Sequence, residues 1–168
     1  MIGRTTVYYT TFMSPLCGIT LVGNKAGLIH LHLQTGEGKK EFSIAGHWVR
    51  DDKFFIEAAS QINDFCAGSR TFFKLKLNPQ GTEFQKRVWE ALRTIPYGET
   101  RSYKQVAEKI GNKNAGRAVG MANSKNPIPL IIPCHRVVGA NGALTGFAHG
   151  LTIKQKLIEL ERGVMAAE

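Results

Sequence analysis

Apolar and polar residues alternate along the first third of the chain. Residues 7–12 (VYYTTF), 18–23 (GITLVG) and 27–35 (GLIHLHLQT) each show the two-residue period of a strand. A Ser-Pro pair precedes the second segment, and the turn-forming stretch Asn-Lys-Ala-Gly leads into the third. The pattern therefore predicts three short antiparallel strands joined by turns.

The third of these segments holds two histidines. Leu31 and Leu33 lie on one side of the predicted strand, and His30 and His32 lie on the other. Two histidines alone do not make a common zinc site, and no third ligand follows at a useful spacing. We therefore expect both histidines to face solvent. As a separate expectation, the chain holds no metal and no cofactor.

Helical periodicity begins in the middle of the chain. Residues 53–67 carry one apolar face made of Phe55, Ala59, Ile62 and Cys66. Cys66 is interpreted as a small hydrophobic core residue. The following residues 69–81 (SRTFFKLKLNPQG) predict a strand and then a Pro-Gly linker. This linker divides the chain into an N-terminal α/β domain over residues 1–80 and a C-terminal domain over residues 81–168.

Helix start signals are stronger in the C-terminal half. The pairs Thr82–Gln85 and Ser102–Gln105 both fit the capping box, in which two side chains satisfy the free N–H groups at a helix start. An apolar stripe follows the first pair. The helix after the second pair is short and leads through a turn into another short helix over residues 115–123 (AGRAVGMAN).

Two short helices joined by a glycine-containing turn are the outline of a helix-turn-helix motif, whose second helix enters a DNA groove. A helical hairpin used only for packing is more common. Residues 115–123, however, have almost no side-chain bulk around Arg117. Gly116 and Gly120 each cost about 1 kcal/mol of helix stability relative to alanine, a cost that close approach to a partner would offset. We expect a shallow contact in the minor groove of DNA.

The charge distribution agrees with such a partner. The chain carries a net charge of +9. Residues 1–80 hold 9 basic and 6 acidic side chains (+3), whereas residues 81–168 hold 13 and 7 (+6). A polyanion would therefore contact the second half, although charge alone does not identify nucleic acid.

Cysteine usage and hydropathy restrict the location of the protein. Cys17, Cys66 and Cys134 are widely spaced and include no CxxC pair, which fits neither a disulfide scaffold nor a common zinc module. A reducing compartment is indicated. No apolar run approaches the roughly 20 residues of a membrane span, and the N-terminus lacks the pattern of a signal peptide. We expect a cytoplasmic protein without a membrane partner.

Residues 131–138 (IIPCHRVV) place a cysteine between apolar residues. A buried cysteine is usually an inert small hydrophobe, and a thiol with a pKa of about 8.5 is only a few per cent ionised at neutral pH. Reactivity therefore requires a base. His135 is adjacent to Cys134, but successive side chains of a strand point to opposite faces. Contact between the two requires a turn or a bridging water.

The last helix offers a third member of such a site. Thr152 and Gln155 cap this helix, and Gly163 is expected to end it. Glu161 lies at the edge of its apolar face. There it is either a surface carboxylate or the buried partner of His135.

Several of these motifs together resemble one known family. IPCHRVVG at 132–139, SY at 102–103, GRAVG at 116–120, NP at 126–127 and GALTGFAHG at 142–150 resemble the O6-alkylguanine-DNA alkyltransferases. The resemblance is ordered over residues 82–163 and looser in the N-terminal half. It implies an α+β fold: a small antiparallel-sheet domain of the ribonuclease H type, then a mostly helical domain with a winged-helix-like helix-turn-helix.

The resemblance also implies an activity. The chain would act as a monomer on double-stranded DNA, rotate O6-alkylguanine (and O4-alkylthymine) out of the duplex, and transfer the alkyl group irreversibly to its own cysteine. The implied catalytic residues are Cys134 as nucleophile, His135 as a base acting through water, Glu161 as the residue that orients His135, Asn126 as a support of the turn, and Tyr103 as a donor to the leaving guanine. The implied DNA contacts are Arg117, which would replace the rotated base in the stack, Asn112, Gln85, Lys104 and Ala140. The implied pocket is lined by Pro129, Val137, Phe147 and Ala148.

Two positions depart from the family pattern, and two other functions stay open. Phe147 stands where a tyrosine is common, and His149 stands where a glycine is usual, so the width of the pocket is not determined. A DNA-damage sensor or helix-turn-helix regulator would use the same helices without chemistry. A cysteine hydrolase would use Cys134 and His135, but the chain offers no obvious oxyanion loop.

Overall fold

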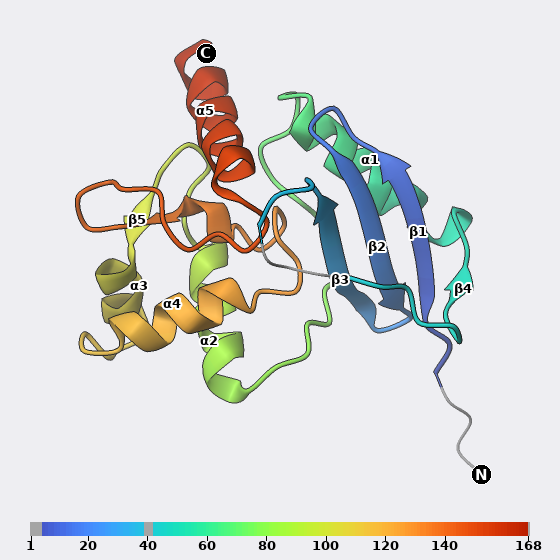
Figure 1. Ribbon diagram of the computed structural model, residues 1–168, viewed down its shortest axis with the longest axis horizontal. Helices are drawn as coiled ribbons and strands as arrows, with labels where there is room; N and C mark the ends of the chain where they lie inside the picture. Colours follow the sequence, from blue (N-terminus) through green and yellow to red (C-terminus); the bar gives the residue numbers. More distant parts are fainter. Residues whose placement is uncertain (1–4, 39–41, 168) are drawn as a thin grey trace.

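The computed structural model describes residues 5–38 and 42–167. It consists of a sheet with one helix and, beside it, a group of helices (Figure 1). In chain order, the elements are β1 (Tyr8–Met13), β2 (Gly18–Asn24), β3 (Gly27–Gln34), β4 (Val49–Arg50), the 3₁₀ helix η1 (Lys53–Phe55), α1 (Ile56–Cys66), α2 (Glu83–Arg93), β5 (Arg101–Ser102), α3 (Tyr103–Lys109), α4 (Gly116–Ser124), the 3₁₀ helix η2 (Cys134–Arg136), β6 (Val137–Val138) and α5 (Leu151–Ala167).

The N-terminal sheet is mixed. Its order is β3-β2-β1-β4, and the three antiparallel strands expected from the alternating pattern are confirmed. The fourth strand, β4, pairs in parallel with β1 and was not expected, so the prediction of a wholly antiparallel sheet was incomplete. Two residues are too few to show a periodic pattern.

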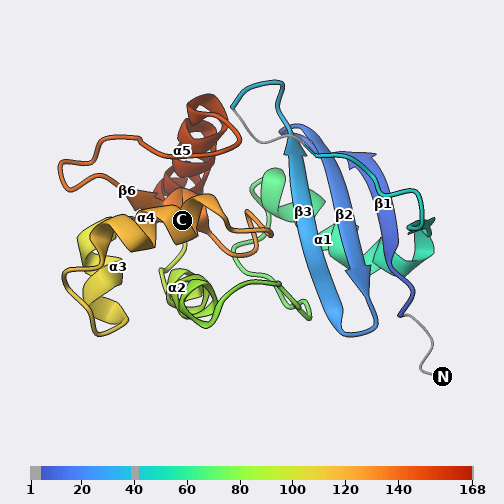
Figure 2. The same ribbon diagram turned by 60° about the horizontal axis from the view of Figure 1, so that its bottom comes forward.

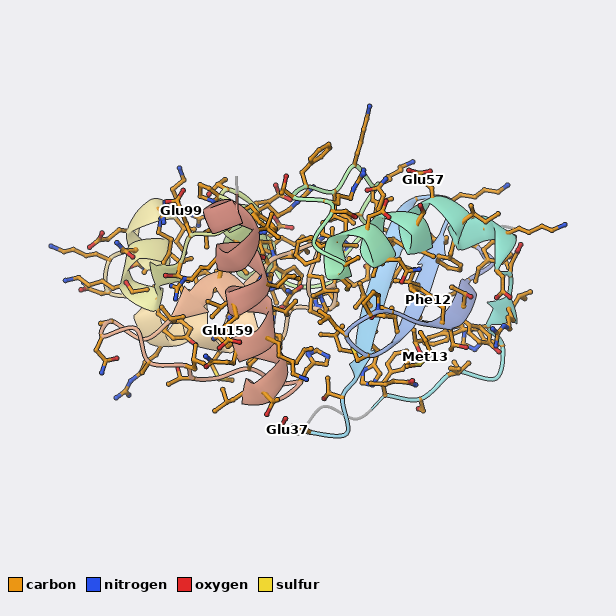
Figure 3. All side chains as sticks on the ribbon, turned by 90° about the horizontal axis from the view of Figure 1, so that it is seen from above. Phe12, Met13, Glu37, Glu57, Glu99 and Glu159 are labelled. Atoms are coloured by element: carbon orange, nitrogen blue, oxygen red, sulfur yellow. The ribbon has the colours of Figure 1, made fainter. Side chains whose placement is uncertain are left out.

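The two faces of the sheet are covered differently. Leu31 lies opposite Leu21 and belongs to the core, and helix α1 crosses one face of the sheet (Figure 3). Cys66 lies in the same core, as expected. On the other face, the ring of Phe42 stacks on His30 and His32 at centroid distances of 4.6 and 4.9 Å. His32 is only 9% exposed. The prediction of a solvent-facing His32 was therefore wrong, because the chain returns across this face.

The prediction of a strand within residues 69–81 is also wrong. This segment forms a single bridge between Leu77 and Leu28. At Lys74, the backbone bonds to a side chain instead: its N–H donates to Oε1 of Gln61 at 2.9 Å, and its carbonyl accepts from Nε2 of Gln61 at 3.1 Å. A glutamine amide thus replaces a neighbouring strand.

The helix-turn-helix consists of α3 and α4, which pack against α2 (Figure 2). Both expected capping boxes are present, at Thr82 with Gln85 and at Ser102 with Gln105. Gly111 follows α3 with a φ of 86°, a left-handed conformation that glycine adopts without strain. Trp89 of α2 is buried, and its Nε1 donates to the carbonyl of Ala122 in α4 at 2.9 Å.

Helix α5 differs from its prediction at both ends. It begins at Leu151, so Thr152 lies within the first turn and is not the cap. It continues through Gly163 to Ala167. One glycine costs a helix only about 1 kcal/mol, which is not enough to end it. Across the described parts of the chain, no helix combines the length and the apolar character needed to cross a membrane.

Candidate active site

A tight turn presents Cys134. Asn126 lies at its start and is buried; its Nδ2 donates to the carbonyl of Ile132 at 2.8 Å, and its Oδ1 accepts from the N–H of Ile128 at 2.9 Å. Leu130 has a φ of 72°, a conformation that is costly for a residue with a side chain. The Asn126 amide therefore closes a turn that would not form on backbone preferences alone.

The chain turns again at the cysteine itself. Cys134 and His135 lie in the single-turn helix η2, where successive side chains point about 120° apart. The turn that the sequence required at this place is present. Cys134 is 4% exposed, and its carbonyl accepts from Nδ2 of Asn123 at 3.4 Å. The sulfur therefore lies almost entirely inside the protein.

His135 and Glu161 form a buried pair. Nε2 of His135 lies 2.5 Å from Oε2 of Glu161, and both side chains are buried. Arg136 donates to both carboxylate oxygens, at 2.8 and 3.1 Å, and the N–H of Gly98 donates to Oε1 at 3.0 Å. Of the two possibilities for Glu161, the structure has the buried one. The ring of Phe65, from α1, packs edge-on against His135 at 6.4 Å.

These contacts set the charges of the pair. Burial lowers the pKa of His135, and Glu161 only partly opposes this effect. Burial alone would raise the pKa of Glu161, but His135 and Arg136 outweigh it and lower that pKa to about 2. The carboxylate is therefore ionised and the imidazole neutral near pH 7. Nε2 of His135 then donates to Glu161, which leaves Nδ1 as an acceptor. Within the described residues, Nδ1 is buried without a hydrogen-bond partner.

Lys154 is a site residue that the sequence reading missed. It is completely buried in α5, and its Nζ donates to the carbonyls of Val137 at 2.5 Å and Thr145 at 2.8 Å. Burial lowers its pKa to about 8, and a Cys134 thiolate, when formed, would oppose this shift. Lys154 precedes Glu161 by seven residues, on the same face of the helix. That spacing was the one signal in the sequence that could have revealed it.

Two of the expected pocket residues, Phe147 and Ala148, belong to the loop after β6. We call residues 139–150 the active-site loop. Phe147 of this loop is buried, and its ring lies 5.9 Å from Nζ of Lys154. Val137 and Pro129 are buried as well, and Ala148 is half-buried. Tyr103 approaches the loop from α3, and its hydroxyl donates to the carbonyl of Thr145 at 3.2 Å.

The expected DNA-contacting residues are more exposed than this buried group. Four of them are exposed: Lys104 in α3, Asn112 in the turn, Arg117 in α4 and Ala140 in the active-site loop. Gln85 is half-buried, and its Oε1 accepts from the N–H of Thr82 in the capping box. Its side chain therefore already has a structural role.

Two glycines of α4, Gly116 and Gly120, differ in how closely other parts of the protein approach them. A Cβ added at Gly116 would meet no described atom within 4 Å, so packing within the protein does not require glycine there. At Gly120, an added Cβ would lie 3.8 Å from the ring of Tyr103. The arrangement leaves room for a partner at the backbone of α4, beside Arg117.

No metal site accompanies these groups in the part of the chain that is described. Across residues 5–38 and 42–167, no three His, Cys, Asp or Glu side chains come together in a way that could hold an ion. Burial raises the pKa of Cys66 to about 11 and also raises the pKa of Cys17. Both thiols are therefore protonated at neutral pH and poor nucleophiles.

The structure combines a sheet with a helix-turn-helix, a motif typical of DNA-binding proteins, and places a buried cysteine next to a buried histidine. Residues 7–79 match the ribonuclease-like domain of 6-O-methylguanine DNA methyltransferase, and residues 83–163 match its DNA-binding domain. The chain belongs to the methylated-DNA–protein-cysteine methyltransferase family. The fold class and the family resemblance expected from the sequence are both confirmed.

Individual relatives are similar over nearly their whole length. The methyltransferase of Methanosarcina acetivorans is 51% identical over 155 residues, which are 92% of this chain and 98% of the relative. The Mycobacterium tuberculosis methyltransferase is 46% identical over 164 residues, which are 96% of each chain. A crystal structure of the M. tuberculosis protein OGT in complex with DNA has a TM-score of 0.85 and 46% identity, and the match covers 94% of each chain.

Proposed function

We propose that this protein repairs O6-alkylguanine in DNA by direct reversal, with Cys134 as the acceptor of the alkyl group. Family membership carries the reaction class: the chain is a methylated-DNA–protein-cysteine methyltransferase. The assignment of the acceptor rests on the position of Cys134 next to the buried pair of His135 and Glu161. Burial raises the pKa values of the thiols of Cys17 and Cys66, which makes them unsuitable.

The buried pair supplies the base. His135 Nδ1 accepts the thiol proton through one water, and the ionised Glu161 stabilises the imidazolium that results. The thiolate then attacks the alkyl carbon: the new S–C bond forms as the C–O6 bond breaks, and the electron pair passes to the guanine. The guanine takes up one proton in place of the alkyl group, and the imidazolium gives up the proton that came from the thiol, so the protons balance. The thioether is stable and no second cysteine is placed to resolve it, so each molecule reacts once.

The active-site loop supplies the pocket for the base. Val137, Pro129, Phe147 and Ala148 present apolar surface to the rotated nucleotide. The hydroxyl of Tyr103 donates to the carbonyl of Thr145 in the free protein; its single proton turns to the guanine when the base occupies the pocket. Lys154 holds both walls of this pocket, because its Nζ bonds to Val137 on one side and Thr145 on the other.

The helix-turn-helix supplies the DNA contact. The protein binds DNA, and we infer that α4 lies in the minor groove with its glycine-lined surface against the backbone. Lys104 and Asn112 are exposed on the same motif and contact phosphates, which add affinity without sequence preference. We propose that the two domains meet near residue 80 and that the protein acts as a monomer in the cytoplasm.

Arg117→Ala is expected to weaken base rotation more than DNA association. An extruded base leaves a gap in the stack, and base rotation costs a few kcal/mol. The guanidinium fills the gap and offsets part of this free energy. Loss of one exposed phosphate or stacking contact should change the Kd for undamaged duplex by less than about fivefold, whereas alkyl transfer should slow by about 30-fold or more. Binding titrations and single-turnover rates measure the two effects. Lys113→Ala, an exposed cation in the preceding turn, is the control. Equal losses in both quantities would remove Arg117 from this role.

The direct test of the function follows the sulfur. The protein is incubated with a duplex that contains one O6-methylguanine, digested with trypsin, and analysed by mass spectrometry. We expect the peptide 126–136, which carries Cys134, to gain the mass of one CH2 in proportion to the guanine restored. An unmodified peptide beside unrepaired DNA would support a sensor or regulator instead. Repeated turnover on an ester or amide would support a hydrolase.

A further inference from the structure

The N-terminal domain contacts the active-site loop through the segment after β3. Thr35 Oγ1 lies 2.6 Å from the carbonyl oxygen of His149 and 3.0 Å from that of Glu37. A hydroxyl has one proton, and the shorter distance is to His149. Next to it, Oγ1 of Thr152 donates to Oε1 of Glu37 at 3.1 Å. Figure 3 shows Glu37 beside the first turn of α5.

The two segments approach each other as closely as backbones can. A Cβ added at Gly38 would lie 2.3 Å from the carbonyl oxygen of Ala148, and a Cβ added at Gly150 would lie 2.9 Å from Cβ of Glu37. Both glycines have positive φ angles, 86° and 107°. Only glycine fits at either place. This contact between the domains is therefore built into the backbone and does not depend on long, flexible side chains.

A side-chain stack continues the contact toward the pocket. The ring of His149 lies 5.7 Å from the ring of His32 in β3 and 5.6 Å from the ring of Phe147. All three side chains are buried. The active-site loop is thus held by Lys154 and Tyr103 from the C-terminal domain, and by Thr35 and its neighbours from the N-terminal domain.

We propose that Thr35 is a positioning residue for alkyl transfer. Its hydroxyl holds the backbone at His149, and this keeps the ring of Phe147 in place beside Lys154. Thr35 acts through the loop and touches neither the base nor the sulfur. Loops with few buried contacts open locally, and a displaced pocket wall would misalign the alkyl carbon with the thiolate. The inference rests on the proposed function, and it assigns the ribonuclease-like domain a part in the reaction.

Thr35→Val removes the hydroxyl and keeps the shape of the side chain. Loss of one hydrogen bond of ordinary strength should slow methyl transfer from a duplex with one O6-methylguanine by about 3- to 10-fold. The Kd for undamaged duplex should change by less than about twofold, because the contact with α4 is unaffected. Hydrogen exchange should become faster at residues 145–150 and stay unchanged in β1 and β2. Thr35→Ser should restore the rate and the protection.

Thr11→Val is the matched control, since Thr11 is a half-buried threonine of β1 in the same domain. It should leave both readouts as in the wild type. A Thr35→Val protein with wild-type rate and wild-type exchange would overturn the inference, and so would a Thr35→Ser protein as slow as Thr35→Val. If Cys134 of the wild-type protein stays unmodified after incubation with O6-methylguanine DNA, the proposed function is overturned. Hydrogen exchange at residues 145–150 in Thr35→Val would still show whether Thr35 holds the loop.

Discussion

Cys134→Ala is expected to abolish alkyl transfer completely while DNA binding is retained. The substitution removes the atom that forms the new bond, and no other described thiol can replace it, because burial raises the pKa of Cys66 to about 11 and Cys17 is protonated as well. Removal of one small buried atom costs only about 1 kcal/mol of stability. The measurements are the fraction of O6-methylguanine restored in a single-turnover reaction and the Kd for the same duplex.

Cys66→Ala is the control for this variant. It removes a thiol of equal size from an equally buried position in α1. The Cys66→Ala protein should repair the duplex at the wild-type rate, with the CH2 group on the peptide 126–136. Residual repair by Cys134→Ala, or a modified peptide 54–70 in any variant, would show that another sulfur accepts the alkyl group.

Glu161→Gln is expected to affect both rate and stability. The carboxylate accepts from His135, Arg136 and the N–H of Gly98. The glutamine amide has one acceptor oxygen where the carboxylate has two. Its NH2 group, itself a donor, would face one of the donors that now bind Glu161. Arg136 would then be a buried charge without a counterion, which costs about 3 kcal/mol and lowers Tm by about 6–12 °C in a chain of this size. Alkyl transfer should slow by about tenfold or more, since His135 loses its orientation and the charge that stabilises its protonated form.

The control for Glu161→Gln lies on the same helix. Glu159 lies two residues before Glu161 on the exposed side of α5 (Figure 3). The Glu159→Gln substitution should change neither the rate of alkyl transfer nor Tm. DNA affinity should stay close to that of the wild type in both variants. An unchanged rate in Glu161→Gln would exclude Glu161 from the reaction and leave it a purely structural role.

The same carboxylate predicts a specific dependence of stability on pH. The pKa of Glu161 is about 2 in the folded state, below the value of about 4.3 in an unfolded chain. Its contribution is therefore fully present above about pH 4.3 and is lost as the pH falls toward 2. Urea unfolding between pH 6 and pH 3 should show a larger loss for the wild type than for Glu161→Gln. Parallel curves would contradict the low pKa.

Local patterns identified most of the elements that carry the site. The strands β1 to β3 follow from a two-residue period, and the starts of α2 and α3 follow from capping boxes, because both signals depend on residues within one segment. Cys134 and His135 were found as neighbours in the chain. Glu161 was found because a carboxylate at the edge of an apolar face needs a partner, but the spacing left its burial open.

Local patterns failed where another segment decided the outcome. Residues 69–81 alternate like a strand, yet the amide of Gln61 takes the hydrogen bonds that a neighbouring strand would have made. His32 was expected in solvent, yet Phe42 covers it.

The sequence alone predicted the pair of Cys134 and His135, the helix-turn-helix and a division into two halves, since each prediction depends on a short stretch of residues. Only the tertiary structure decided that Arg136 shares the carboxylate of Glu161, that Lys154 joins the two walls of the pocket, and that Thr35 holds the active-site loop from the other domain. These contacts join residues 9 to 114 positions apart. A periodic pattern describes which face of an element is buried, but it contains no information about which distant group that face meets.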